Sequence, residues 1–151
     1  MKILFATDGA KQSFSAVSAF RQLALNEGDE IKVISVVDVG FPVARDIYGG
    51  YLPDTTELEK TTRENAVRSL DETVERLKTV LGNKIINIST EVLFGSPESR
   101  IVETADEMKP DLVVVGSHGY RAWERLLIGS VSDAVVHHAP CSVLVVRTKP
   151  E

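Results

Sequence analysis

The fold is decided by Leu112-Val113-Val114-Val115-Gly116-Ser117-His118-Gly119, which is followed after nine residues by Gly129-Ser130-Val131-Ser132. Four apolar, mostly β-branched residues in a row are typical of a strand that is buried on both faces. The glycines and serines behind them mark a turn, and residues 130–138 then show a helical pattern. The stretch therefore predicts a strand, a glycine loop and a helix start in direct succession.

Apolar runs of the same kind recur along the chain and alternate with helical patterns. We expect strands over 2–7, 31–39, 86–94, 111–117 and 141–147, and helices over 11–26, 54–81, 97–109 and 130–138. Strands that alternate with helices predict one α/β domain over 1–151, with a parallel sheet covered by helices on both faces. Ligands of such sheets bind beyond the carboxyl ends of the strands.

Three local patterns give more detailed expectations. Gly28 is expected to close the helix over 11–26. The helix over 54–81 should begin with an N-cap pair, Asp54 and Glu57, and pack one apolar stripe on the sheet. That stripe is formed by Val67, Leu70, Val74, Leu77 and Leu81. The long connection over 39–53 has two interpretations, a lid over the strand ends or a poorly ordered insertion.

Composition excludes several classes of protein. The 151 residues are 43% hydrophobic and carry a net charge of −5, with lysine and arginine scattered along the chain. This pattern argues against a nucleic-acid surface, and no apolar run is long enough to span a membrane. The single cysteine, Cys141, excludes an internal disulfide and fits a cytoplasmic protein. His137, His138 and Cys141 lack a fourth ligand, so we expect no metal site.

The glycine stretch itself has two interpretations. A helix that opens at Gly129-Ser130 offers unpaired backbone N–H groups, a hydroxyl and the positive end of the helix dipole, which suit an anion such as phosphate. In the alternative, the glycines serve only the turns and Ser130 is a plain N-cap with Asp133 three residues later. The stretch matches neither the Walker A motif nor the dinucleotide-binding fingerprint.

The spacing Gly-x2-Gly-x9-Gly-Ser, formed by Gly116, Gly119, Gly129 and Ser130, resembles the ATP-binding signature of the universal stress protein family. The similarity extends over the whole chain, including residues 5–9, 35–38 and 139–146. The resemblance implies a Rossmann-like (adenine nucleotide alpha hydrolase-like) fold of five parallel strands in the order 3-2-1-4-5. It also implies ATP, with or without Mg2+, as the ligand and a homodimer that forms through the C-terminal strand.

The resemblance further implies a set of nucleotide-binding residues. They are Ala6, Thr7, Asp8, Val36, Val115, Gly116, His118, Gly119, Gly129, Ser130, Val131 and Ser132. Gly119 and the residues from 129 to 132 would contact the phosphates, and Gly116 would border ribose and phosphate. The residues from 6 to 8 and Val36 would line the adenosine end. Ala10 departs from the family pattern, because many relatives have a serine there.

Three functions are compatible with these patterns. The first is a cytoplasmic, nucleotide-dependent regulator of a stress response that acts on an unidentified protein partner. The second is a slow ATPase or autophosphorylating enzyme, for which we find no general base, phosphate-clamping lysine or metal-binding carboxylates. The third is a dimeric interaction protein that works without nucleotide. We expect the first, a binding protein rather than an enzyme.

Overall fold

The computed structural model describes residues 1–9, 13–38, 56–117 and 129–147. Its elements are β1 (Lys2–Ala6), α1 (Ser13–Ala19), the 3-10 helix η1 (Phe20–Gln22), β2 (Glu30–Val37), α2 (Thr56–Leu81), β3 (Asn87–Phe94), α3 (Pro97–Met108), β4 (Leu112–Gly116), α4 (Ser130–His138) and β5 (Ser142–Val146). In these ranges, no helix has both the length and the apolar character needed to cross a membrane.

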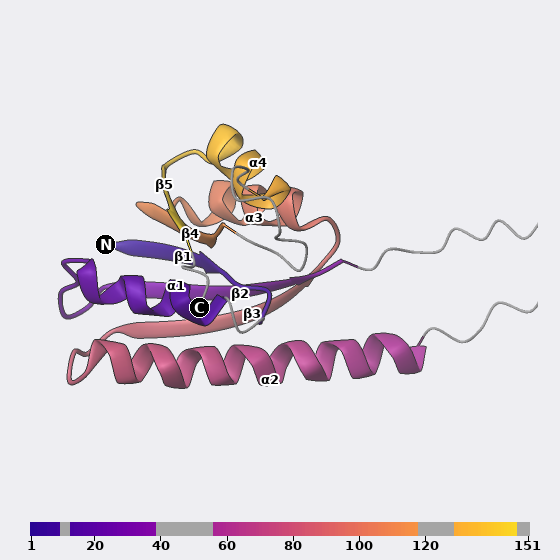
Figure 1. The fold of residues 1–151 in the computed structure, drawn as a ribbon, viewed down its shortest axis with the longest axis horizontal. Helices are drawn as coiled ribbons and strands as arrows, with labels where there is room; N and C mark the ends of the chain where they lie inside the picture. The colour runs from indigo at the N-terminus through magenta and orange to yellow at the C-terminus, as the bar shows by residue number, and fades with distance from the viewer. Residues whose placement is uncertain (10–12, 39–55, 118–128, 148–151) are drawn as a thin grey trace, which may run out of the picture.

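The five strands form one parallel sheet in the order β3-β2-β1-β4-β5, as predicted (Figure 1). The central strand β1 pairs with β2 on one side and β4 on the other, so that Phe5 lies between Val33 and Val114. All three side chains are fully buried. Because both faces of these strands are covered, their sequences are nearly continuous apolar runs.

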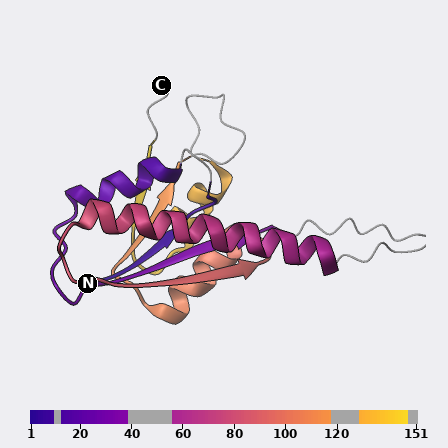
Figure 2. The same ribbon diagram turned by 90° about the horizontal axis from the view of Figure 1, so that it is seen from below.

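Helices cover the two faces of the sheet and define two hydrophobic clusters. In Figure 1, α3 and α4 lie above the sheet and α2 lies below it, and α1 shares a hydrophobic cluster with α2. Figure 2 shows α1 and α2 side by side, and the contacts between these helices agree. Phe5 and Phe20 pack at a ring-centroid distance of 5.3 Å in the lower cluster, while Leu4 and Ile34 belong to the upper one. Successive residues of a strand thus serve opposite faces.

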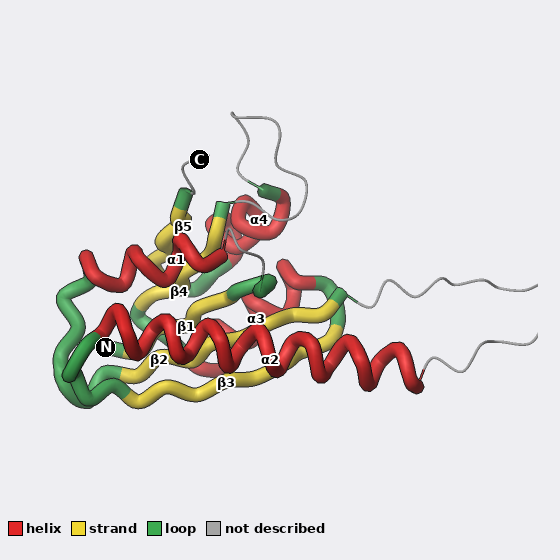
Figure 3. Tube along the Cα trace, turned by 60° about the horizontal axis from the view of Figure 1, so that its bottom comes forward, coloured by secondary structure: helices red, strands yellow, loops and turns green. Residues whose placement is uncertain are grey.

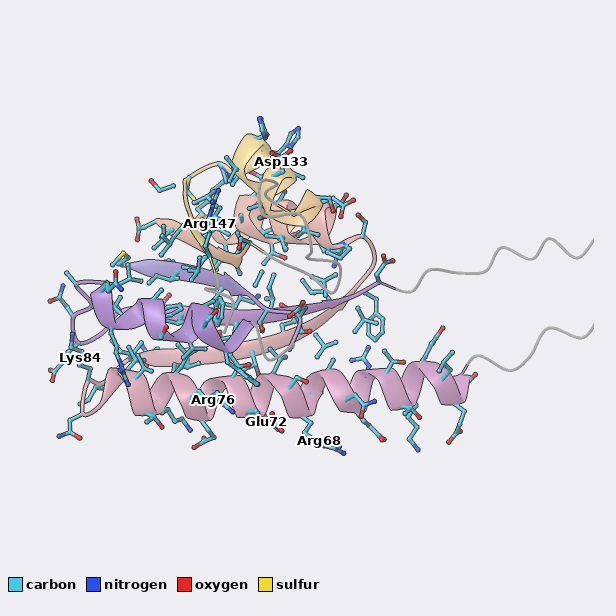
Figure 4. The ribbon with its side chains drawn as sticks, in the orientation of Figure 1. Arg68, Glu72, Arg76, Lys84, Asp133 and Arg147 are labelled. Atoms are coloured by element: carbon cyan, nitrogen blue, oxygen red, sulfur yellow. The ribbon has the colours of Figure 1, made fainter. Side chains whose placement is uncertain are left out.

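The buried face of α2 differs from the predicted stripe. Its buried residues are Ala66, Leu70, Thr73, Leu77 and Leu81, whereas Val67 is 45% exposed. The prediction of Val67 as a packed residue is wrong because helical spacing fits both sets of residues, and α2 rests on the sheet through the face that carries Ala66 and Thr73. Figure 4 shows the charged side chains of Arg68 and Glu72 on the outer side of this helix.

The N-terminal turns of α2 extend beyond the sheet. Figure 3 shows the helix running past the end of β3, and all side chains from residue 56 to 65 except that of Thr62 are exposed. Leu58 is 69% exposed even though it continues the row of Ala66 and Leu70 toward the N-terminus. The sheet ends before this part of the stripe, so the apolar side chain has no strand to cover.

The first helix is shorter than predicted. α1 ends at Ala19 and the 3-10 helix η1 continues it only to Gln22 rather than Asn26, because Leu23 is extended and the chain turns to bury Leu25. Gly28 does not cap this helix; with φ +86° it forms the turn before β2, and its N–H donates to the Ile85 carbonyl. Asp54 and the 39–53 connection lie outside the described residues.

Truncation of the α2 stripe tests this packing. Leu77 is fully buried, so Leu77→Ala should lower the free energy of unfolding by about 2–5 kcal/mol, the usual cost of such a cavity. The matched change in the exposed part of the same helix, Leu58→Ala, should alter it by less than about 0.5 kcal/mol. Urea denaturation measures both, and equal effects would contradict the assignment of the buried face.

Candidate functional site

The carboxyl ends of β1 and β4 lie side by side at the centre of the sheet. Ala6 pairs in register with Val115, and the N–H of Thr7 donates to the Ile34 carbonyl of β2 at 2.9 Å. The chain leaves β1 toward β2, while β4 lies on the opposite side of β1. This is the topological switch point, the place where parallel α/β sheets bind ligands.

The turn after β1 is held against α2. Gly9 has φ +71°, and its N–H donates to Thr7 Oγ1 at 3.2 Å. A Cβ added to Gly9 would lie 2.6 Å from the Cβ of Ser69, which is too short for any real contact. Only glycine therefore satisfies both the positive φ and the close approach of the helix. Exposed Asp8 is presented from this turn.

The start of α4 is held against the end of β4 by backbone hydrogen bonds. The Gly129 N–H donates to the Ser117 carbonyl at 3.0 Å, and the Ser117 N–H donates to the Val146 carbonyl of β5 at 2.9 Å. A Cβ added to Gly129 would lie only 3.0 Å from the Ser117 oxygen. Here glycine is favoured by the limited space and not by its dihedral angles, because its φ is −57°.

The helix N-terminus at this place is an anion-binding type of structure. Gly129 is the N-cap of α4, and no side chain caps the helix among the described residues. The prediction that Ser130 is the N-cap is therefore wrong, because it is the first residue of the helix. The N–H groups of Ser130, Val131 and Ser132 belong to the first turn, which has no intrahelical acceptors for them. Together with the helix dipole, they favour a negatively charged ligand.

The described residues of the expected binding set all lie at this edge. Ala6 ends β1 and Thr7 and Asp8 follow it, Val36 lies near the end of β2, and Val115 and Gly116 end β4. Val36 is half-buried and Val115 is 2% exposed, and both side chains belong to the upper hydrophobic cluster. Ser132 is 1% exposed. His118 and Gly119, expected to contact the ligand, lie outside the described residues.

The structure adds two residues that the sequence pattern did not single out. Ser69 supports the Asp8-Gly9 turn from α2, and the Ser117 carbonyl holds Gly129. Ser117 was visible as the residue after Gly116 in the glycine stretch. For Ser69, the only signal was a small residue beside the buried stripe of α2, and that signal does not reveal which turn it touches.

Two other features are separate from this edge. Burial raises the pKa of the Cys141 thiol, which favours its protonated form. A cavity of about 280 Å3 lies at the opposite, amino edge, between the end of α2 and the start of β3. It is lined by Val74, Lys78, Leu81, Gly82, Lys84, Ile86 and Ile88.

The parallel sheet in the order β3-β2-β1-β4-β5, with a glycine-started helix at its switch point, defines a Rossmann-like α/β protein. Residues 1–147 match the Universal stress protein family. A universal stress protein of Methanocaldococcus jannaschii is 35% identical over 150 residues, which cover 99% of this chain and 83% of the relative. The chain belongs to the universal stress protein family.

Solved structures of the family have the same fold. Universal stress protein UspA from Lactobacillus plantarum gives a TM-score of 0.75 at 24% identity, with 97% of each chain covered. A universal stress protein in complex with cAMP gives 0.66 at 26% identity, covering 99% of this chain and 98% of the other. An Arabidopsis thaliana family protein with AMP bound gives 0.65 at 17% identity, covering 99% and 92%.

Substitution of Gly9 tests the contact between the β1 turn and α2. Gly9→Ala should destabilise the protein by more than Gly28→Ala, although both glycines have positive φ. The strain at positive φ costs roughly 1–2 kcal/mol in each variant. Only Gly9→Ala adds a clash with Ser69, since a Cβ at Gly28 meets nothing within 4 Å. Thermal unfolding measures both changes, and equal destabilisation would contradict a close contact at Ser69.

Proposed function

We propose that this chain binds an adenine nucleotide, ATP in particular, at the carboxyl edge of its sheet. We further propose that it acts as a homodimeric, cytoplasmic regulator whose partners respond to nucleotide occupancy. The observation that carries the proposal is the placement of the α4 N-terminus. The bond from Gly129 N–H to the Ser117 carbonyl puts the first turn of this helix beside the ends of β4 and β1.

The phosphates would lie at the start of α4. Gly129 has no side chain to hold a ligand away, and the N–H groups of the next three residues are donors for phosphate oxygens. Ser130 is exposed, so its hydroxyl is a further donor. Asp133 is exposed in the same helix (Figure 4), but it lies one position beyond the first-turn donors. Gly119 would complete the phosphate contacts. Mg2+ would accompany the phosphates as a counterion.

The adenosine would lie across the ends of β1 and β2. Asp8 is exposed beside Gly9 and could accept a hydrogen bond from ribose or base. Backbone groups around Val36 would read the adenine edge. The family structures with cAMP and AMP support an adenine nucleotide at this fold, since these ligands share the adenosine and differ in phosphate.

The homodimer would form through β5. This strand is at the edge of the sheet in the described strand order, and Val143, Leu144, Val145 and Val146 are all only partly buried. An apolar edge strand with unpaired backbone groups is a template for association. Pairing with a second copy would cover both the backbone and the apolar side chains.

Calorimetry tests the nucleotide proposal. We expect ATP to bind wild-type protein with a Kd in the micromolar range, and GTP to bind at least about tenfold more weakly because its base offers a different hydrogen-bonding edge. Gly129→Val should abolish binding, because its Cβ would be 3.0 Å from the Ser117 oxygen and its methyl groups would extend further.

The control for this experiment is on the same helix. Val136→Ala removes a 45% exposed side chain from α4, away from its first turn, and should bind ATP like the wild type. Circular dichroism must show that Gly129→Val retains its fold. Equal ATP affinity of wild type and Gly129→Val, or absence of saturable binding, would refute the proposal. Mass analysis of small molecules released from purified protein identifies the bound nucleotide.

A charge on β5 tests the dimer. Val145→Lys places an ammonium on the partly buried edge strand and should produce a monomer at micromolar concentration. The matched change on α4, Val136→Lys, should leave the dimer intact, because this residue lies on the outer face of a helix. Multi-angle light scattering distinguishes the two states. A wild-type monomer, or a dimeric Val145→Lys protein, would rule out the β5 interface.

A further inference from the structure

We infer that the hydroxyl of Ser132 is a positioning group that fixes the peptide between Gly129 and Ser130, and that it is not itself a ligand of the nucleotide. This inference rests on the proposed nucleotide site at the start of α4. In this inference, Ser132 contacts the phosphate through its backbone N–H. Its hydroxyl instead orients the backbone N–H of Ser130, which is another donor to the phosphate.

The hydrogen bonds around Gly129 carry the inference. Ser132 Oγ donates to the Gly129 carbonyl oxygen at 2.9 Å, and the Asp133 N–H donates to the same oxygen at 2.9 Å. A carbonyl oxygen has two lone pairs, so both are used. The Gly129 N–H is held in turn by the Ser117 carbonyl at 3.0 Å. Each side of this glycine is therefore anchored.

Peptide geometry transmits this anchoring to the binding donors. The Gly129 carbonyl and the Ser130 N–H belong to one planar trans peptide, in which they point in opposite directions. When the carbonyl is held into the helix by two donors, the Ser130 N–H must point out of its N-terminus. Glycine at 129 would otherwise allow this peptide to rotate, because it has the widest choice of backbone conformations.

Burial separates the two serines of this turn. Ser132 is 1% exposed, and its hydroxyl proton is already donated to Gly129. Ser130 is exposed. A ligand can thus approach the Ser130 side chain directly, whereas it would have to break a buried bond to reach the Ser132 hydroxyl.

Binding of a ligand series to Ser132→Ala tests the effect on affinity. The affinity for ATP, ADP and AMP should fall by about fivefold to tenfold, the effect of one hydrogen bond, while the affinity for adenosine should stay within about twofold of wild type. Ser132→Thr restores the hydroxyl and should restore phosphate-dependent affinity. An equal loss for adenosine would indicate general damage and overturn the inference, as would an unchanged affinity for ATP.

Hydrogen exchange in the nucleotide-free protein distinguishes a positioning group from a direct ligand. In Ser132→Ala, the Gly129 carbonyl loses one of its two donors. The hydrogen bonds made by the Gly129 and Asp133 N–H groups are then held less firmly, so these two amides should exchange about tenfold faster. Unchanged exchange combined with weaker ATP binding would make the hydroxyl a direct ligand and overturn the inference. If the wild type binds no nucleotide, the proposed function is refuted but the role of the Ser132 hydroxyl is not, because hydrogen exchange in the nucleotide-free protein still tests that role.

The matched control is Ser18→Ala. Ser18 Oγ donates to the Ser15 carbonyl three residues earlier, the same spacing as in Ser132, but in α1 and on the exposed surface. Loss of this bond should change neither exchange at Gly129 and Asp133 nor nucleotide affinity. Faster exchange in α4 of Ser18→Ala would mean that the readout follows global stability, and the inference would fall.

Discussion

Parallel pairing of β1 with both β2 and β4 is the constraint on which the rest of the structure depends. It places Phe5 between Val33 and Val114 in the middle of a doubly covered sheet. It also creates the switch point at the carboxyl ends, since the chain leaves β1 toward one neighbour only. The two glycine turns are consequences: Gly9 lets the end of β1 approach α2, and Gly129 lets α4 start against β4.

Most of the fold could be predicted because its signals are local. Apolar β-branched runs identified the strands, and α2 ends at Leu81 as expected, just before Gly82 with φ +64°. The errors arose where tertiary packing decides. The end of α1 depends on the burial of Leu25, and the exclusion of Val67 from the packed face depends on where α2 rests on the sheet. Neither is encoded in a window of neighbouring residues.

The location of the candidate site could be predicted from the sequence, but the roles of its individual groups could not. Strand ends and a glycine-serine pair locate the edge, and spacing alone cannot show that Ser132 Oγ donates inward to Gly129. A serine in the first turn of a helix can face a ligand or its own backbone, and only burial separates these roles. The approach of Ser69 to Gly9 is a contact between distant segments and follows from the topology.

The overhang of α2 has a consequence for local unfolding. An isolated helical segment of about ten residues is marginal in water, because few side chains offset the entropy of ordering it. In the described part of the chain, residues 56 to 65 are mostly exposed, with the Arg63 guanidinium over the Phe94 ring, so they should open at a smaller free energy than the turns around Leu70 and Leu77. One continuous helix thus spans two regions of very different stability, and the boundary between them falls near the residue that supports the β1 turn, Ser69.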